Sequence, residues 1–122
     1  MPIYKVKSFV RFAKRERISD TALVAAVERA DRGLIDADLG GGLIKQRVAR
    51  PGQGRSGGFR TVIAYQARER AVFLYGFAKN ERNNIAGHEL EALRKIAALW
   101  LRADAASVAR HIAEGSAEEV ER

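Results

Sequence analysis

Apolar and polar positions change period along this 122-residue chain, which predicts a mixture of helices and strands. Residues 2–7 alternate as in a short strand with one buried side. Ser8 is placed to cap a short helix that follows, and Ser19 to cap a second one. Gly33 can end the second helix in the left-handed conformation. That helix has the clearest apolar stripe in the chain, formed by Leu23, Ala26, Val27, Ala30 and Leu34.

The middle of the chain has the pattern of β-strands, in residues 43–50, 58–66 and 70–78. Only three residues separate the last two segments, so we expect them to form an antiparallel hairpin. Residues 35–42 contain three consecutive glycines and are expected to form a loop. The two carboxylates of this loop, Asp36 and Asp38, have no third candidate metal ligand nearby, and we expect them to lie in solvent.

A third helical pattern starts at Glu89 and places one set of apolar residues on a single face: Leu90, Leu93, Ile96, Ala97 and Trp100. Residues 103–114 can form another short helix, whereas the acidic tail after it is poorly specified. The predicted fold is therefore α+β, with an antiparallel-rich four-stranded sheet. Two N-terminal helices would pack on one face, and one or two C-terminal helices would follow. The length suits a single domain over residues 1–122.

Composition favours a polyanionic partner, because the formal net charge is +7 and the sequence pI is about 10.2. The chain has no cysteine, which excludes disulfides, thiol chemistry and cysteine-type zinc sites. No apolar run is long enough to span a membrane, and the N-terminal residues lack the apolar segment of a signal peptide. We therefore expect a cytoplasmic protein.

The positive charge is concentrated in one part of the chain. Residues 45–82 contain nine Lys or Arg and two acids, a balance of +7 that equals the net charge of the whole chain. Alternation places Lys45 and Arg47 on one side of their strand, opposite Ile44 and Val48. A strand surface this basic is suited to binding phosphates.

Three further cations extend this basic region. Arg60 lies among apolar residues of the next strand, where a charge is costly unless it faces a cleft, and Lys79 and Arg82 follow the third strand. Clustered cations lower a lysine's pKa by repulsion, so that it can act as a general base, and arginines can stabilise a phosphate as its charge develops. The alternative is that all these residues are ordinary outward-facing cations.

Other catalytic constellations are missing from the sequence. Only two histidines are present, His88 and His111, and neither lies in a motif that would pair them for ribonuclease chemistry. No serine-hydrolase or metal-hydrolase pattern is visible, and we expect no metal and no cofactor. Any acid–base chemistry would have to use Lys, Arg, Tyr or a group of the substrate.

Three motifs resemble the RelE/ParE superfamily of toxins, and its HigB-like (RelE-type) branch is the nearest match. They are GGLIKQRVAR at residues 41–50, GGFRTVIAY at 57–65 and FLYGFAKNERNNI at 73–85. The string FAKNER is the most specific part. The resemblance covers about residues 1–102, and residues 103–122 add little to it.

This resemblance implies the toxin of a type II toxin–antitoxin pair. RelE-type members enter the ribosomal A site and cleave mRNA without a metal, by attack of the ribose 2′-OH on the adjacent phosphate. Carried over by position, the catalytic residues would be Lys45, Arg60, Lys79 and Arg82. Either lysine would be the base, and the two arginines would hold the phosphate.

Three more arginines, Arg47, Arg50 and Arg55, would bind RNA, with Arg47 as the positioning residue. Arg68 and Arg70 lie near strand ends, where contacts to the ribosomal RNA backbone are the expectation. Tyr75 could stack on a base or belong to the core. Two alternatives remain open: a ParE-like poison of DNA gyrase and a non-catalytic RNA-binding module.

The resemblance also implies partners. Besides the ribosome and mRNA, the chain would bind a cognate helix-turn-helix antitoxin that blocks its activity. The complex would repress its own operon, so operator DNA would be contacted only through the antitoxin complex.

Overall fold

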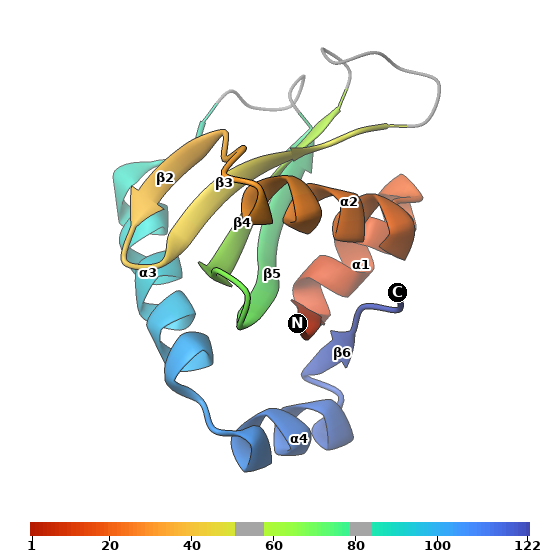
Figure 1. The fold of residues 1–122 in the computed structure, drawn as a ribbon, viewed down its shortest axis with the longest axis vertical. Coiled ribbons are helices and arrows are strands. Elements are labelled where there is room, and N and C mark those ends of the chain that lie inside the picture. The colour runs from red at the N-terminus through yellow and green to blue at the C-terminus, as the bar shows by residue number, and fades with distance from the viewer. Residues whose placement is uncertain (51–57, 79–83) are drawn as a thin grey trace.

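The computed structural model describes residues 1–50, 58–78 and 84–122, and in it one mixed sheet carries helices on both faces (Figure 1). The elements follow in the order β1 (Ile3–Val6), α1 (Lys7–Glu16), α2 (Asp20–Asp31), β2 (Ala37–Gly40), β3 (Leu43–Val48), β4 (Phe59–Gln66), β5 (Arg70–Ala78), α3 (Gly87–Arg102), α4 (Ala105–Glu114) and β6 (Ala117–Glu119). The α+β class, the two N-terminal helices and the two C-terminal helices agree with the sequence-based prediction.

The sheet of the described residues has six strands in the order β2-β3-β4-β5-β1-β6, not the four predicted. β1 runs parallel to β5, and every other neighbouring pair is antiparallel. The additional strands are the two edges. β2 lies in the segment expected to be a loop, and β6 lies in the tail that looked unspecified. Both are very short, and each forms by pairing with a neighbour, so neither has a period of its own.

Local contacts explain how the two edge strands form. Gly40, Gly41 and Gly42 all have positive φ, which allows the tight connection between β2 and β3. The Asp38 side chain accepts a hydrogen bond from the Gly40 backbone at 2.9 Å and supports the same turn. At the other edge, the Val120 backbone donates to the carbonyl of Ile3 at 2.8 Å, and the Val120 side chain is buried.

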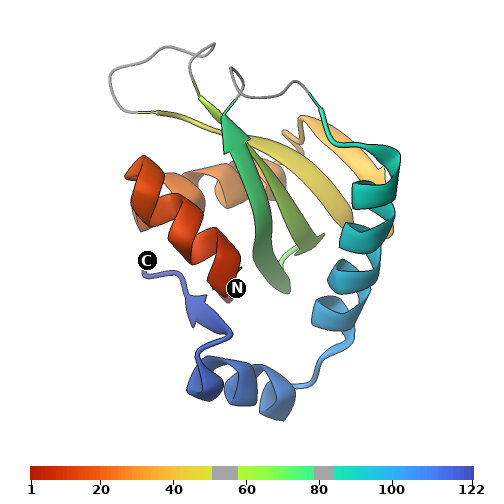
Figure 2. The same cartoon turned by 180° about the vertical axis from the view of Figure 1, so that it is seen from behind.

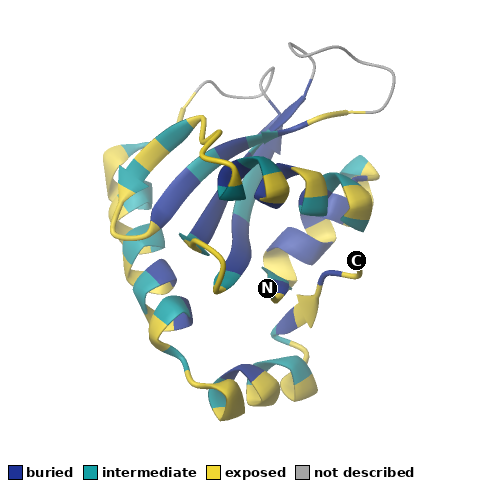
Figure 3. Cartoon of the chain, in the orientation of Figure 1, coloured by how far each residue is buried: buried dark blue, intermediate teal, exposed yellow. Residues whose placement is uncertain are grey.

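Two hydrophobic clusters lie on opposite faces of the sheet. On one face, α1 and α2 pack Phe9, Phe12 and Leu23 against strand residues (Figure 2). On the other face, α3 packs Ala97 against the central strands, and α4, which lies next to β6, adds Val108 to the same cluster. The inner sides of the helices and most of the central strands are buried (Figure 3). We refer to these two surfaces of the sheet as the α1 face and the α3 face.

The predicted helix ends are confirmed in part. Ser19 caps α2, and its hydroxyl accepts a hydrogen bond from the Ala22 backbone at 3.2 Å. Gly33 adopts φ +83°, so the chain leaves the helix there and Leu34, 57% exposed, does not continue the apolar stripe. Ser8 is not a cap, because α1 starts at Lys7 directly after β1. Ile96 is also partly exposed rather than buried in the α3 interface.

Candidate nucleic-acid interface

The structure places Lys45, Arg47 and Arg60 on the α3 face of the sheet. Lys45 pairs with Val62, which belongs to the cluster under α3, and residues that pair directly across two strands share a face. Arg47 follows Lys45 by two positions and pairs with Arg60. The prediction that Lys45 and Arg47 lie opposite Ile44 and Val48 is therefore confirmed, since the latter two pack on the α1 face. We call these three residues the cationic face.

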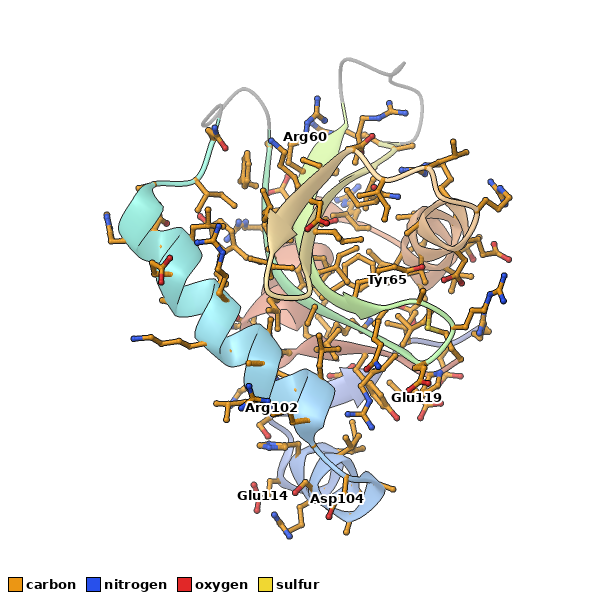
Figure 4. The ribbon with its side chains drawn as sticks, turned by 60° about the vertical axis from the view of Figure 1, so that its left-hand side comes forward. Arg60, Tyr65, Arg102, Asp104, Glu114 and Glu119 are labelled. Carbon is orange, nitrogen blue, oxygen red and sulfur yellow. The ribbon has the colours of Figure 1, made fainter. Side chains whose placement is uncertain are left out.

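Part of the Arg60 guanidinium group is buried in an unfavourable environment. Its Nη1 atom is buried and has no hydrogen-bond partner among the described residues. A buried guanidinium nitrogen without an acceptor lowers stability, and a phosphate oxygen is an acceptor that fits it. Figure 4 shows Arg60 at the opposite end of the molecule from Arg102, Asp104 and Glu114. Arg60 is thus the residue of the cationic face whose surroundings point most directly to an anionic ligand.

Two aromatic residues of β5 border the cationic face. Tyr75 pairs with Val62, and Phe77 pairs with Arg60, so both lie on the α3 face next to the cations. Their ring centroids are 6.0 Å apart. Tyr75 is half-buried and packs against the cluster under α3, whereas Phe77 is almost fully buried. Of the two roles considered for Tyr75, core packing is confirmed, and stacking of its accessible part on a base stays a prediction.

Gln46 fixes the position of β3, and its role was not anticipated from the sequence. This buried side chain donates from Nε2 to the carbonyls of Ala26 and Leu34, each at 3.0 Å. Its Oε1 accepts a hydrogen bond from the Asp36 backbone at 3.0 Å. The only signal for this role was a polar residue at a position where alternation requires an apolar one.

Asp36 and Arg29 hold the backbone of Arg47 from two sides. The Arg47 backbone donates to Asp36 Oδ2 at 2.6 Å, and its carbonyl accepts a hydrogen bond from the Arg29 guanidinium. Burial lowers the pKa of Arg29, as do nearby Arg47 and Arg32, while Asp36 acts in the opposite direction. Asp36 is exposed, as expected, but its carboxylate is occupied by the backbone of the cationic face.

Two other predicted cations among the described residues, Arg50 and Arg70, do not join this group. Arg50 is exposed, and its guanidinium lies 5.4 Å from the ring centroid of Phe59, which packs on the α1 face. Arg70 donates to the carbonyls of Trp100 and Ala103 at 2.6 and 2.8 Å. It therefore ties β5 to the end of α3, and the expected contact of its guanidinium with ribosomal RNA stays a prediction.

Three predicted site residues, Arg55, Lys79 and Arg82, lie outside the described residues. Neither histidine has a contact with the cationic face among the described residues. His88 is exposed at the start of α3, and the His111 ring packs 4.8 Å from Trp100 and contacts the Ser116 hydroxyl at 2.9 Å. Among residues 1–50, 58–78 and 84–122, no group of three His, Cys, Asp or Glu could hold a metal.

No helix in the described part of the chain is long and apolar enough to cross a membrane.

A family model described as the RelE toxin of the RelE/RelB toxin–antitoxin system matches residues 1–120. The match extends beyond residue 102, where the motif resemblance ended, and includes α4 and β6. A comparison with curated proteins gave no significant match.

Proposed function

The chain belongs to the RelE family of toxins from toxin–antitoxin systems, and we propose that it is a ribosome-dependent mRNA endoribonuclease of the HigB-like branch. It would inhibit translation by cutting mRNA in the ribosomal A site. The observation that carries this proposal is the cationic face, above all the buried Arg60 Nη1 without an acceptor among the described residues. A face of this kind suits a phosphodiester substrate, and a ribosomal substrate would place the reaction in the cytoplasm.

The proposed reaction uses a nucleophile that the RNA itself supplies. The ribose 2′-OH loses its proton to a base and attacks the adjacent phosphorus, while the bond from phosphorus to the 5′-oxygen breaks. The leaving 5′-oxygen takes up a proton, and the products are a 2′,3′-cyclic phosphate and a 5′-OH. This chemistry needs acid–base groups, which typically contribute about 10²–10⁴-fold to a rate. It also needs stabilisation of the phosphate charge, where loss of one donor typically costs about 10²–10³-fold.

We assign the roles by position on the cationic face. Lys45 is the candidate base among the described residues, and its side chain makes no hydrogen bond or ion pair with them. Lys79 is the other candidate base, and it lies outside the described residues. Arg60 would hold the scissile phosphate together with Arg82, while Arg47 would position the RNA.

The family match implies an antitoxin partner, because the family is described as the toxin of a toxin–antitoxin system. We propose that the antitoxin is a helix-turn-helix protein with an acidic surface that covers the cationic face. The net charge of +7 favours such a partner. Operator DNA would be bound by the complex through the antitoxin.

Induced expression with mapping of mRNA ends tests the proposal. The chain should arrest growth and produce cuts within translated reading frames. Arg60→Ala should remove both effects, whereas Arg102→Ala, a matched loss of an exposed arginine at the end of α3, should retain them. A DNA-damage response without mRNA cuts would instead identify a gyrase poison. RNA binding that is sensitive to salt but causes no cleavage would identify a binding module.

A further inference from the structure

A groove separates α1 from the end of β5 and is not part of the cationic face. Its volume is about 290 Å³, and it is lined on the strand side by Tyr75, Gly76 and Phe77. Figure 2 shows α1 alongside β5. A Cβ atom on Gly76 would lie 2.4 Å from the Phe12 ring, so glycine allows the helix to approach this closely. We call this feature the α1–β5 groove.

The helix side of the groove is cationic. Ser8, Arg11 and Arg15 line it from one face of α1, at positions i, i+3 and i+7. The exposed Arg11 side chain makes no hydrogen bond or ion pair with the described residues. Arg15 is 66% exposed, and its Nε contacts the partly buried carboxylate of Glu16 at 3.2 Å. Ion pairs at the protein surface are weak, so this contact leaves Arg15 able to bind another anion.

Aromatic rings contact two guanidinium groups, of which Arg15 lines the groove and Arg50 does not. Arg15 lies 5.6 Å from the ring centroid of Phe12, and Phe12 contacts Phe59 edge-on at 5.7 Å. Arg50 lies 5.4 Å from the ring centroid of Phe59 on the same aromatic pair. Such stacking restricts the arginine side chains, so less entropy is lost when they bind an anion.

The groove and the cationic face lie on either side of β5. Phe77 lines the groove and pairs with Arg60, while Tyr75 lines it and pairs with Val62. Neighbouring strands lie about 4.8 Å apart, so the groove opens within roughly two strand spacings of Arg60. A single strand of RNA held at Arg60 could therefore cross β5 and enter the groove.

We propose that the α1–β5 groove is a second RNA subsite that binds the single-stranded segment flanking the scissile phosphate. This inference rests on the proposed function. Arg11 and Arg15 bind backbone phosphates, the Ser8 hydroxyl adds a hydrogen bond, and the accessible part of Tyr75 supplies an apolar surface for a base. RNA is favoured over an acidic peptide because only β5 separates the groove from the phosphate-binding face, and because the groove combines arginines with an aromatic border.

Binding of fluorescent RNA by the full chain tests this subsite. For an RNA of about 12 nucleotides, Arg11→Ala/Arg15→Ala should weaken binding at least about tenfold and reduce the salt slope by about 1.4. For an RNA of about three nucleotides, which fits the cationic face alone, the same variant should bind as the unchanged chain does. The matched control is Lys7→Ala/Lys14→Ala, which removes two exposed charges of α1 outside the groove and should change binding less than about twofold.

Three results would overturn the proposal: an unchanged affinity of the groove variant, an equal loss in the control variant, or an equal loss with the short RNA. Retained RNA binding with lost binding of a glutamate-rich peptide would identify a protein-docking surface instead. The Arg11→Lys/Arg15→Lys variant keeps both positive charges, so it separates an effect of lost charge from a folding defect. Ribosome-dependent cleavage is measured separately. If the chain cleaves mRNA but the groove variant binds RNA normally, only the second subsite is contradicted. If the groove variant loses RNA binding but the chain does not cleave mRNA, only the proposed nuclease activity is contradicted.

Discussion

Arg47 and Arg60 stand directly opposite each other across β3 and β4, on the same face of the sheet. Directly opposed like charges destabilise a sheet. In addition, the Nη1 atom of Arg60 is buried and has no acceptor among the described residues. A fold that retains this arrangement accepts a local loss of stability. Binding of a phosphate at this position would offset that loss.

Arg60→Met should therefore stabilise the protein while removing its toxicity. Loss of the opposed charge and of the buried unsatisfied nitrogen should raise the free energy of unfolding by about 1 kcal/mol. Urea denaturation measures this change. Arg102→Met, at an exposed position, should alter stability by less than about 0.5 kcal/mol and leave toxicity intact. A destabilised Arg60→Met protein would mean that Arg60 has a structural role.

Gln46→Leu should lower stability, because three backbone groups, one of them buried, would lose a hydrogen-bond partner. The carbonyls of Ala26 and Leu34 and the amide of Asp36 depend on this side chain. We expect a loss of about 2–3 kcal/mol in unfolding free energy. Faster amide hydrogen exchange should appear at Asp36 and Arg47. A variant that unfolds like the unchanged chain would show that this network contributes little.

Gly76→Ala tests the close approach of α1 to β5. The added methyl group would meet the Phe12 ring at 2.4 Å, so the helix or the ring must move, at a cost of about 1–3 kcal/mol. Gly87→Ala is the matched control, because a Cβ there meets nothing within 4 Å at the start of α3. This control should be neutral or stabilising by about 0.5 kcal/mol. Thermal unfolding of both variants gives the comparison, and equal midpoints would contradict the packing described.

Tyr65 should make stability depend on pH in the alkaline range. Burial raises the pKa of Tyr65, and its hydrogen bond to Asp31 raises it further. The unfolded chain releases this proton near the ordinary pKa of 10.0, whereas the folded protein keeps it. The contribution to stability is therefore complete below pH 10.0 and is lost as pH rises towards the raised pKa of the folded state.

Comparing Tyr65→Phe with the unchanged chain isolates this effect. The variant should lose about 1 kcal/mol at neutral pH because its hydrogen bond to Asp31 is gone. Above pH 10.0 its unfolding free energy should fall less steeply, by a fraction of the ~1.4 kcal/mol per pH unit that one proton gives. Identical slopes for the two proteins would contradict the role assigned to Tyr65.

Strong local patterns made much of the fold predictable. The Ser19 cap, the three central strands and the side of the strand that carries Lys45 and Arg47 each depend on a few neighbouring residues. β2 and β6 were missed because strands of four and three residues show no period and form only through their partners. Their formation is a tertiary effect, which the order of residues within either segment does not reveal.

The candidate site was predictable only where charge alternates along a strand. Arg70 looked equivalent to the other cations, because its partners are carbonyls at the end of α3, about 30 residues away in sequence. Gln46 gave only a break in alternation, and nothing local indicated that its amide would join α2 to β3. The groove cations Arg11 and Arg15 gained significance only when the fold placed them beside β5.

Cleavage of mRNA on programmed ribosomes tests the proposed nuclease activity most directly. The purified chain is incubated with ribosomes that hold an mRNA and an empty A site, and the ends of the RNA products are analysed. We expect a cut within the A-site codon that leaves a 2′,3′-cyclic phosphate and a 5′-OH, no cut in the same RNA without ribosomes, and a rate about 10²–10³-fold lower for Arg60→Ala. Intact mRNA on the ribosome, or cleavage unaffected by Arg60→Ala, would contradict the account.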